Sequence, residues 1–464
     1  MELLALERLR DFRRGVFDLC SHRADALSNV IDGALTAGLV PSFAYLSLQS
    51  AHQRGHGSLY AALAKGRMEI EGVRRLVANT LPKTDRPVYA IDTSTYIRGD
   101  AETSPERGVY YHSSRHSAGK PVVAGWSYSW CAQLGEYSSS WTAPVDVSRV
   151  PIEVDAHDLA GRQMRAVMAL LPAGTKPLFA FDAGYDPTRL AEQVAEDEAA
   201  VLVRLRRNRC FYADPLEEQR AAVGRPSTHG AKFTCNNPAT WPVPDFEHGV
   251  DDEGYGYVHV RAWRELHARA QNHPGRGTRK TKPVIRGTLI LLEVSKLPRE
   301  TRQPRTFWLW WRGPGLPDLA FLWRAYVRRF DLEHTFRFLK TTLNWQTPRL
   351  RHPEQADLWS WLVLLAFTQL RLSKSMVEDV KLPWQRPQER QRMTPSRVRR
   401  GFIELLPILG TSASVPKPCG KSPGRPRGSL SGRATRFPAK QRRTSNAKHL
   451  DQLPVEQQQV TLTC

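Results

Sequence analysis

Three acidic residues lie at positions where α/β proteins commonly place a ligand-binding or catalytic site. Asp92 follows the apolar run VYAI, Asp182 follows LFAF, and Glu333 lies in a helix predicted over residues 326–340. Carboxylates at the ends of neighbouring strands meet at one edge of a sheet. Two such charges repel unless a cation lies between them, and Mg²⁺ binds through a few carboxylates together with substrate phosphates. The pattern predicts a metal site with Glu333 as third ligand; for each aspartate alone, a turn at the end of a strand is the alternative.

The segment YVRRFDLEHTFRFLK, residues 326–340, carries charge beside aromatic surface. Helical periodicity places four polar residues on one face: Tyr326, Arg329, Glu333 and Lys340. It places three apolar residues on an adjacent stripe: Leu332, Phe336 and Leu339. The stripe predicts docking on a core, with the polar row directed into a site. The alternative is a solvated face whose Arg and Glu pair at i, i+4.

The charge balance points to a polyanionic partner. The chain has 464 residues and a formal net charge of +21, and nucleic acid is favoured over an anionic membrane surface because Lys and Arg release phosphate counterions. Six scattered cysteines without a C-x-x-C pair indicate neither a zinc site nor a disulfide framework and fit a reducing cytoplasm. The N-terminus lacks a signal-peptide pattern, and the apolar stretch 358–367 is too short to span a bilayer.

Residue patterns predict a mixed α/β fold class in which strands and helices alternate after residue 85. The segment 57–77 is compatible with a helix-turn-helix, although two packed helices with a basic turn are the commoner arrangement. The predicted divisions are a helical, DNA-binding N-terminal domain over 1–84, a catalytic part over 85–205, a β-rich insertion over 206–318, a second catalytic part over 319–375, and a basic, largely disordered tail over 376–464.

These motifs resemble one family. The segment 326–340 matches Y-x2-R-x3-E-x6-K through Tyr326, Arg329, Glu333 and Lys340, which is the signature of one branch of bacterial insertion-sequence DDE transposases. The stretches AIDTST and FDAGYD resemble the strand of the first aspartate and the D-x-G-[YF] motif of the second. The resemblance implies an RNase H-like catalytic domain that is interrupted by a β-rich insertion.

The resemblance also implies a reaction. Asp92, Asp182 and Glu333 would hold two Mg²⁺ ions, with Mn²⁺ as a substitute, for DNA cleavage at transposon ends and strand transfer into target DNA by cut-and-paste. Tyr326, Arg329 and Lys340 would grip phosphates of the transposon end. The implied partners are double-stranded DNA, as terminal inverted repeats and as target, and a second copy in a homodimeric synaptic complex. The implied location is the bacterial cytoplasm, at the nucleoid.

Two further DNA contacts are suggested by the same resemblance. Relatives can hold a flipped base on an insertion-domain tryptophan, for which Trp308 and Trp310 are candidates beside Trp311 and Trp323, although aromatics in such a strand commonly pack in a core. In the tail, PGRPRG with Arg425 and Arg427 resembles an AT-hook core that enters a narrow minor groove. A nonspecific basic arm is the alternative.

Two other functions are compatible with the residues. The chain could be an inactive or domesticated transposase that only occupies DNA, a reading that the intact acidic triad disfavours. It could also be an RNase H-like host nuclease, which would cut RNA in hybrids without joining DNA ends.

Overall fold

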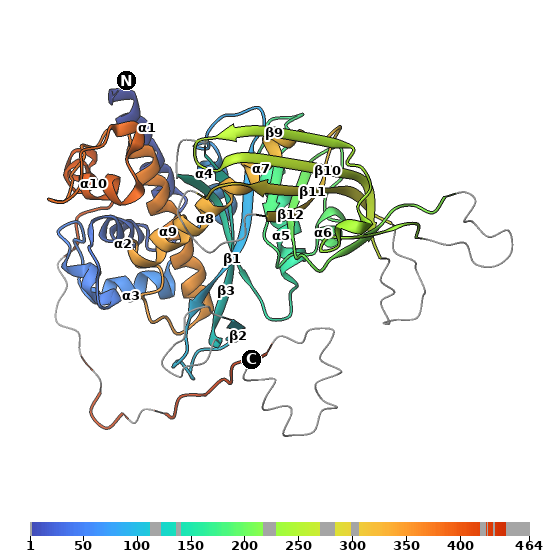
Figure 1. Cartoon of the computed structure of the whole chain (residues 1–464). Coiled ribbons are helices and arrows are strands. Elements are labelled where there is room, and N and C mark those ends of the chain that lie inside the picture. The colour runs from blue at the N-terminus through green and yellow to red at the C-terminus, as the bar shows by residue number, and fades with distance from the viewer. Residues whose placement is uncertain are drawn as a thin grey trace.

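In the computed structural model of the protein, the described residues form one central mixed sheet of 12 strands (Figure 1). The structure describes residues 2–111, 122–135, 141–216, 229–269, 284–297, 306–417, 424, 426–429 and 432–441. The strands are β1 (Val88–Ile97), β2 (Gly108–Tyr111), β3 (Val122–Leu134), β4 (Thr142–Val150), β5 (Leu178–Phe181), β6 (Ala200–Leu205), β7 (Cys210–Tyr212), β8 (Lys232–Thr234), β9 (Phe246–Asp252), β10 (Gly256–Ala268), β11 (Arg286–Val294) and β12 (Thr306–Arg312). The helices are α1 (Glu2–Asp18), α2 (Ala24–Thr36), α3 (His56–Lys65), α4 (Ile70–Ala78), α5 (Ala156–Met168), α6 (Pro187–Ala191), α7 (Leu319–Arg328), α8 (Phe330–Thr341), α9 (Pro353–Ser373) and α10 (Pro395–Leu409).

The centre of the sheet has the order β4-β3-β1-β5-β6. Strands β4, β3 and β1 are antiparallel neighbours, whereas β1, β5 and β6 run parallel. Parallel neighbours need a crossover, and helices α5 and α6 supply it. This mixed α/β arrangement is consistent with the RNase H-like domain that the resemblance implies.

Residues 206–318 were predicted as a β-rich insertion, and strands β7 to β12 lie there. Strand β12 pairs with β6 in antiparallel register, so these strands extend the central sheet rather than forming a separate one. Figure 1 shows β9 to β12 at one end of the molecule and most helices at the other. The domain boundaries themselves stay predictions.

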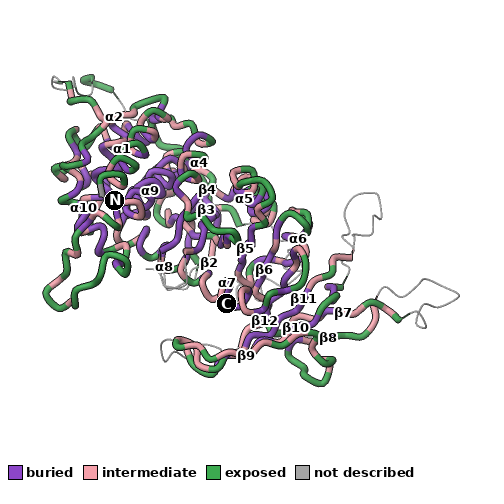
Figure 2. The backbone as a smooth tube through the Cα atoms, turned by 90° about the horizontal axis from the view of Figure 1, so that it is seen from above, coloured by how far each residue is buried: buried purple, intermediate pink, exposed green. Residues whose placement is uncertain are grey.

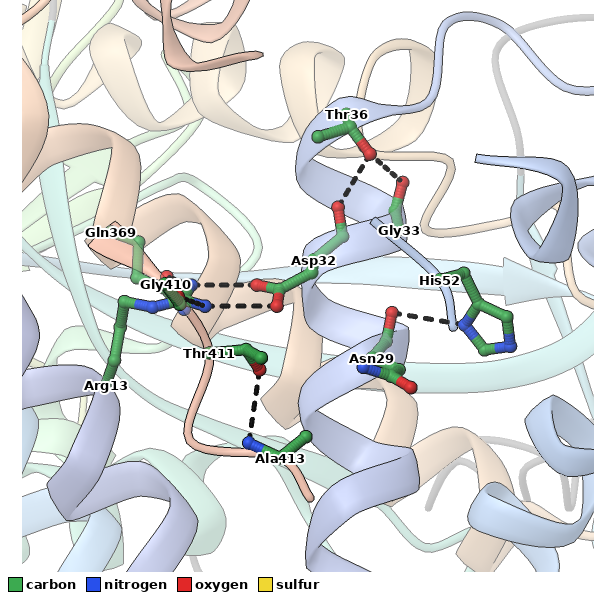
Figure 3. A network of polar contacts seen from close by, with 10 residues as sticks. All are labelled: Arg13, Asn29, Asp32, Gly33, Thr36, His52, Gln369, Gly410, Thr411 and Ala413. Carbon is green, nitrogen blue, oxygen red and sulfur yellow. Dashed lines mark hydrogen bonds and ion pairs between the residues drawn. The ribbon is translucent and has the colours of Figure 1, made fainter. Parts of the chain in front are cut away.

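Helix α9 is largely buried and lies at the centre of the helical part (Figure 2). Helices α1, α2, α3 and α10 pack against it. Arg13 on α1 ties four of these segments together, because its guanidinium donates to Asp32 of α2 at 2.8 and 3.0 Å, to Gln369 of α9 at 2.6 Å and to the carbonyl of Gly410 after α10 at 3.1 Å (Figure 3). The N-terminal and C-terminal parts of the chain therefore share one core.

The tail differs from the expectation. Residues 376–417 are not disordered, since α10 forms over Pro395–Leu409 and buries one face against α1, α2 and α9. Further on, residues 432–441 lie beside β2, where the amides of Phe437 and Lys440 donate to the carbonyls of Glu102 and Arg107.

The helix-turn-helix reading concerned α3 and α4. Helix α4 docks on β4, where Arg74 donates to buried Asp146 at 2.8 and 3.1 Å. Both helices therefore belong to packed cores, and a DNA-reading role for residues 1–84 stays a proposal. In the described ranges, no helix is long and apolar enough to cross a membrane.

Candidate active site

The three predicted acids come from three separate elements. Asp92 lies in β1, where its Oδ1 accepts from the amide of Thr93 at 2.7 Å. Asp182 lies directly after β5, and its Oδ1 accepts from the amide of Gly184 at 3.0 Å. Glu333 lies in the first turn of α8.

The strand register brings the two aspartates together. Ala90 of β1 lies opposite Ala180 of β5 in a parallel pair, and residues two positions further along share the same face. Asp92 and Asp182 are therefore neighbours on one face. The charge of Asp182 acts on Asp92 strongly enough to shift its pKa.

Helix α8 reaches this face through the predicted apolar stripe. Leu332 and Leu339 are fully buried, and the rings of Phe336 and Trp130 of β3 lie 6.3 Å apart. After α8, Trp345 packs edge-on against Trp130 at 5.3 Å between ring centroids. The stripe holds α8 on the sheet, and Glu333 lies on the polar side.

The polar segment is two helices rather than one. Helix α7 ends at Arg328, α8 begins at Phe330, and Arg329 is the residue between them. The residue remains helical at φ −53° and ψ −30°, so the predicted polar row is preserved across the junction. The sequence offered no proline or glycine there to mark the break.

Arg329 joins two of the acids. Its Nη1 donates to Asp92 Oδ2 at 2.9 Å, and its Nη2 donates to Glu333 Oε1 at 3.2 Å. Its charge also acts to lower the pKa of Tyr326. Arg329 is 7% exposed, so this guanidinium is a buried bridge and not a solvated charge.

The charges of the site shift one another's pKa values. Burial raises the pKa of Asp92 to about 6; Arg329 acts against this and Asp182 adds to it. Burial lowers the pKa of Arg329, but Asp92, Tyr326, Asp182 and Glu333 outweigh it and the pKa is raised. Burial lowers the pKa of Lys340, although the charge of Asp92 acts to raise it. Two of the predicted phosphate-binding cations, Arg329 and Lys340, thus both interact with the charge of Asp92.

Asp92 and Asp182 suit a hard divalent cation, since both offer carboxylate oxygens on one face of adjacent strands. Asp92 and Glu333 both accept a hydrogen bond from Arg329, so the guanidinium lies between these two carboxylates. Across the described residues, no group of three or more His, Cys, Asp or Glu side chains is arranged to hold a metal ion. Two members of the predicted triad, Asp92 and Glu333, are therefore joined by an arginine in this structure.

The register also reveals a residue that the sequence interpretation missed. Ala180 lies opposite Leu202 in the parallel pair of β5 and β6. Two residues further along, Asp182 and Arg204 are therefore neighbours, and Asp92, Asp182 and Arg204 form one row across three strands. The only sequence signal was an arginine late in the strand after the second acid.

Arg204 faces the other phosphate-binding candidates. Its guanidinium lies 4.9 Å from the ring centroid of Phe307, whose ring is 6.3 Å from that of Tyr326. Burial raises the pKa of Tyr326, and the charges of Arg329 and Arg204 act to lower it. Arg204 makes no ion pair within the described part of the chain, so its charge is available to a ligand.

The comparison with protein families identifies the chain. A family model described as DDE superfamily endonuclease matches residues 16–274, which include Asp92 and Asp182. The chain belongs to this family. None of the curated proteins matches it. The match ends before residues 326–340, so the specific signature branch stays a prediction.

Membership of the DDE endonuclease family implies DNA as substrate, and such domains generally use divalent metal ions. Within this DDE endonuclease, Tyr185 of the FDAGYD motif also lies near the acids. Burial raises its pKa, and the charges of Asp92 and Asp182 raise it further. Its ring packs on Phe181 at 5.0 Å, so Tyr185 supports the turn that carries Asp182.

The tryptophans that were predicted to contact a flipped base are buried. Trp308 is 3% and Trp310 0% exposed, in a cluster with Trp263. Both alternate along β12 with Leu309, the partner of Arg204, and therefore face away from the acids. Trp311 and Trp323 are buried on the near face in another core cluster. All four serve packing in the DDE endonuclease, because stacking a base on them would open a core.

The AT-hook candidate is only partly described. Arg425 lies outside the described residues. Arg427 is exposed, in a turn. A minor-groove role of these residues stays a prediction.

The pKa of Asp92 predicts the pH dependence of the DDE endonuclease. A carboxyl with a pKa of about 6 loses its charge as pH falls through 6, whereas an ordinary aspartate keeps it to about pH 4. Because metals bind the ionised form, we expect DNA cleavage at limiting Mg²⁺ to fall about tenfold per pH unit below about 6. Rates measured from acidic to neutral pH test this. Saturating Mg²⁺ should move the midpoint lower, and a midpoint near 4 at limiting Mg²⁺ would contradict the assignment.

Proposed function

We propose that the protein is a DNA transposase that cleaves transposon ends and transfers them to target DNA by cut-and-paste. The observation that carries this proposal is that two adjacent acids have cationic side chains beside them. Asp92 and Asp182 offer metal ligands, and Arg329 and Lys340 act on Asp92 from the helical side. Metal ligands beside phosphate-binding cations are what phosphoryl transfer to and from DNA requires.

The residues of the chain bind and orient the scissile phosphate. Arg329 offers a planar fork that matches two phosphate oxygens, Tyr326 supports that fork, and Lys340 adds a compact charge. Arg204 approaches from β6 and binds the backbone beside the scissile bond. Two Mg²⁺ ions, when bound by the acids, would activate the attacking water or 3′-hydroxyl and stabilise the leaving oxygen. Most of the rate enhancement then comes from positioning and charge.

The remaining predicted parts belong to the same proposal. The helical residues 1–84 would contact the terminal inverted repeats, and the basic residues after 417 would add nonspecific affinity. Two copies would hold two ends in a synaptic complex. The net charge of +21 would attract the DNA that such a complex encloses.

The test is cleavage and joining of the DNA that flanks the coding sequence of this chain. Purified protein with Mg²⁺ should cut at short inverted repeats and join the released 3′ ends to a target plasmid. Protein that binds these repeats without cutting them would support the DNA-occupying alternative. Cutting of RNA in RNA–DNA hybrids without any joined product would support the RNase H-like alternative.

Arg204→Ala should weaken the handling of DNA. A charge-assisted hydrogen bond contributes about 1.5–3 kcal/mol, so kcat/KM for end cleavage should fall about 10–100-fold. The slope of the logarithm of the DNA-binding constant against the logarithm of salt concentration should become shallower by about one, as expected for one lost phosphate contact. A suitable control is Arg261→Ala, which removes a half-buried arginine of the same sheet that pairs with Glu293 at 2.7 Å. Equal effects of the two substitutions on kcat/KM would argue against a role for Arg204.

A further inference from the structure

The guanidinium of Arg329 bridges Asp92 and Glu333, two of the acids that are expected to share a metal ion. Its two terminal nitrogens donate to Asp92 and Glu333 at 2.9 and 3.2 Å. The Glu333 side chain is 45% exposed, whereas that of Asp92 is 18% exposed. Glu333 thus lies at the rim of the site and reaches inward only through the arginine.

The charge of Arg329 opposes a divalent cation at this place. A cation held by Asp92 would lie close to the guanidinium, and like charges at such range repel strongly in a buried site. The same oxygen, Asp92 Oδ2, is already engaged by Nη1. A divalent ion must therefore compete with the arginine for Asp92 Oδ2 and for the negative charge of that carboxylate.

We propose that Arg329 is a latch that occupies the carboxylates while DNA is absent and releases them when a DNA phosphate takes over its guanidinium. The inference rests on the proposed function, since the phosphate is that of the bound DNA end. Metal binding and DNA binding then favour each other, because each removes a competitor of the other. The free protein binds metal weakly and is protected from metal-dependent nicking away from its sites.

The chemistry of arginine suits this exchange. A guanidinium donates to carboxylate and phosphate oxygens alike, so the two nitrogens that bond to Asp92 and Glu333 can bond to two oxygens of one phosphate instead. Arg329 lies at the junction of α7 and α8, and α8 begins without a side-chain cap from this residue. Its side chain can therefore change partner without removing a cap from the helix.

The test measures Mn²⁺ binding to the full-length chain without DNA, by electron paramagnetic resonance of the free ion. Arg329→Gln protein should bind Mn²⁺ at least about tenfold more tightly than wild type, because a positive charge is removed from the site. Arg329→Lys should lie between them, since a single ammonium cannot span both carboxylates. A short duplex DNA should tighten Mn²⁺ binding to wild type by a clearly larger factor than to Arg329→Gln, because only wild type also loses the competing arginine.

A matched control is Arg328→Gln. Arg328 precedes the latch in sequence but pairs with Asp331 at 2.5 Å, so its loss should leave the Mn²⁺ affinity unchanged. Thermal unfolding provides a second measurement. Arg329→Gln should unfold at lower temperature than wild type in chelator and gain more from added Mn²⁺, whereas a merely structural arginine would show the loss without the larger gain.

The outcomes separate the latch from the proposed function. Equal Mn²⁺ affinity of wild type and Arg329→Gln, while wild type still cleaves DNA ends with Mg²⁺, overturns the latch alone. Mn²⁺ binding that survives Asp92→Asn and Asp182→Asn in the Arg329→Gln background places the metal elsewhere, which overturns both the latch and the assigned metal ligands.

Discussion

Asp92→Asn protein should cleave DNA at least about a thousandfold more slowly than wild type, since metal-assisted stabilisation of the transition state is worth several kcal/mol. Asparagine keeps the shape and can still accept from the amide of Thr93, but it removes a charge that a divalent cation needs. Asp182→Asn and Glu333→Gln should have comparable effects. Single-turnover cleavage of end DNA at saturating protein measures the loss.

The same variants should still bind end DNA, because removing negative charge beside the phosphate does not weaken attraction to DNA. Retained binding with lost cleavage separates a chemical defect from misfolding. The control is Asp158→Asn, an exposed aspartate on α5, which should cleave like wild type. Cleavage at the wild-type rate by all three acid variants would remove these residues from the active site.

Arg13→Ala should lower the free energy of unfolding by about 3–5 kcal/mol, the usual effect of leaving one partner of a buried ion pair alone. The Asp32 side chain is 4% exposed, and burial raises its pKa despite the opposing charge of Arg13. Without Arg13 its carboxylate would be desolvated and uncompensated. Three further segments, α1, α9 and the turn after α10, would also lose their common contact (Figure 3). Chemical denaturation followed by circular dichroism measures the change.

Arg14→Ala is the matched control, because Arg14 is an exposed neighbour on α1 and should change stability by less than about 0.5 kcal/mol. The double variant Arg13→Met, Asp32→Leu should recover much of the loss, since apolar residues of similar volume often replace a buried ion pair without cost. If Arg13→Ala is as stable as Arg14→Ala, the network does not hold the helical part together.

Residue patterns predicted the parts of the fold that depend on neighbouring residues in the chain. The strand that carries Asp92, the strand before Asp182 and the long apolar helix α9 were all identifiable, because alternation and helical periodicity report burial locally. The cap of α5 is equally local: Asp155 accepts from the amide of His157 at 2.9 Å. Helix α10 was missed because its burial depends on partners that are distant in sequence.

For the site, residue types and spacings alone predicted the candidates: Asp92, Asp182 and Glu333 as acids, with Tyr326, Arg329 and Lys340 as the polar row beside them. Spacing along a helix is a local property and survives even the junction at Arg329.

Only the tertiary structure decided which of these side chains meet. Strand register placed Arg204 in line with the aspartates and turned Trp308 and Trp310 into the opposite core, because a one-residue shift moves a side chain to the other face of a sheet. The packing of α8 on the sheet placed the guanidinium of Arg329 between Asp92 and Glu333. A helical pattern predicts which residues share a face, whereas the partner of that face depends on contacts between segments far apart in the chain.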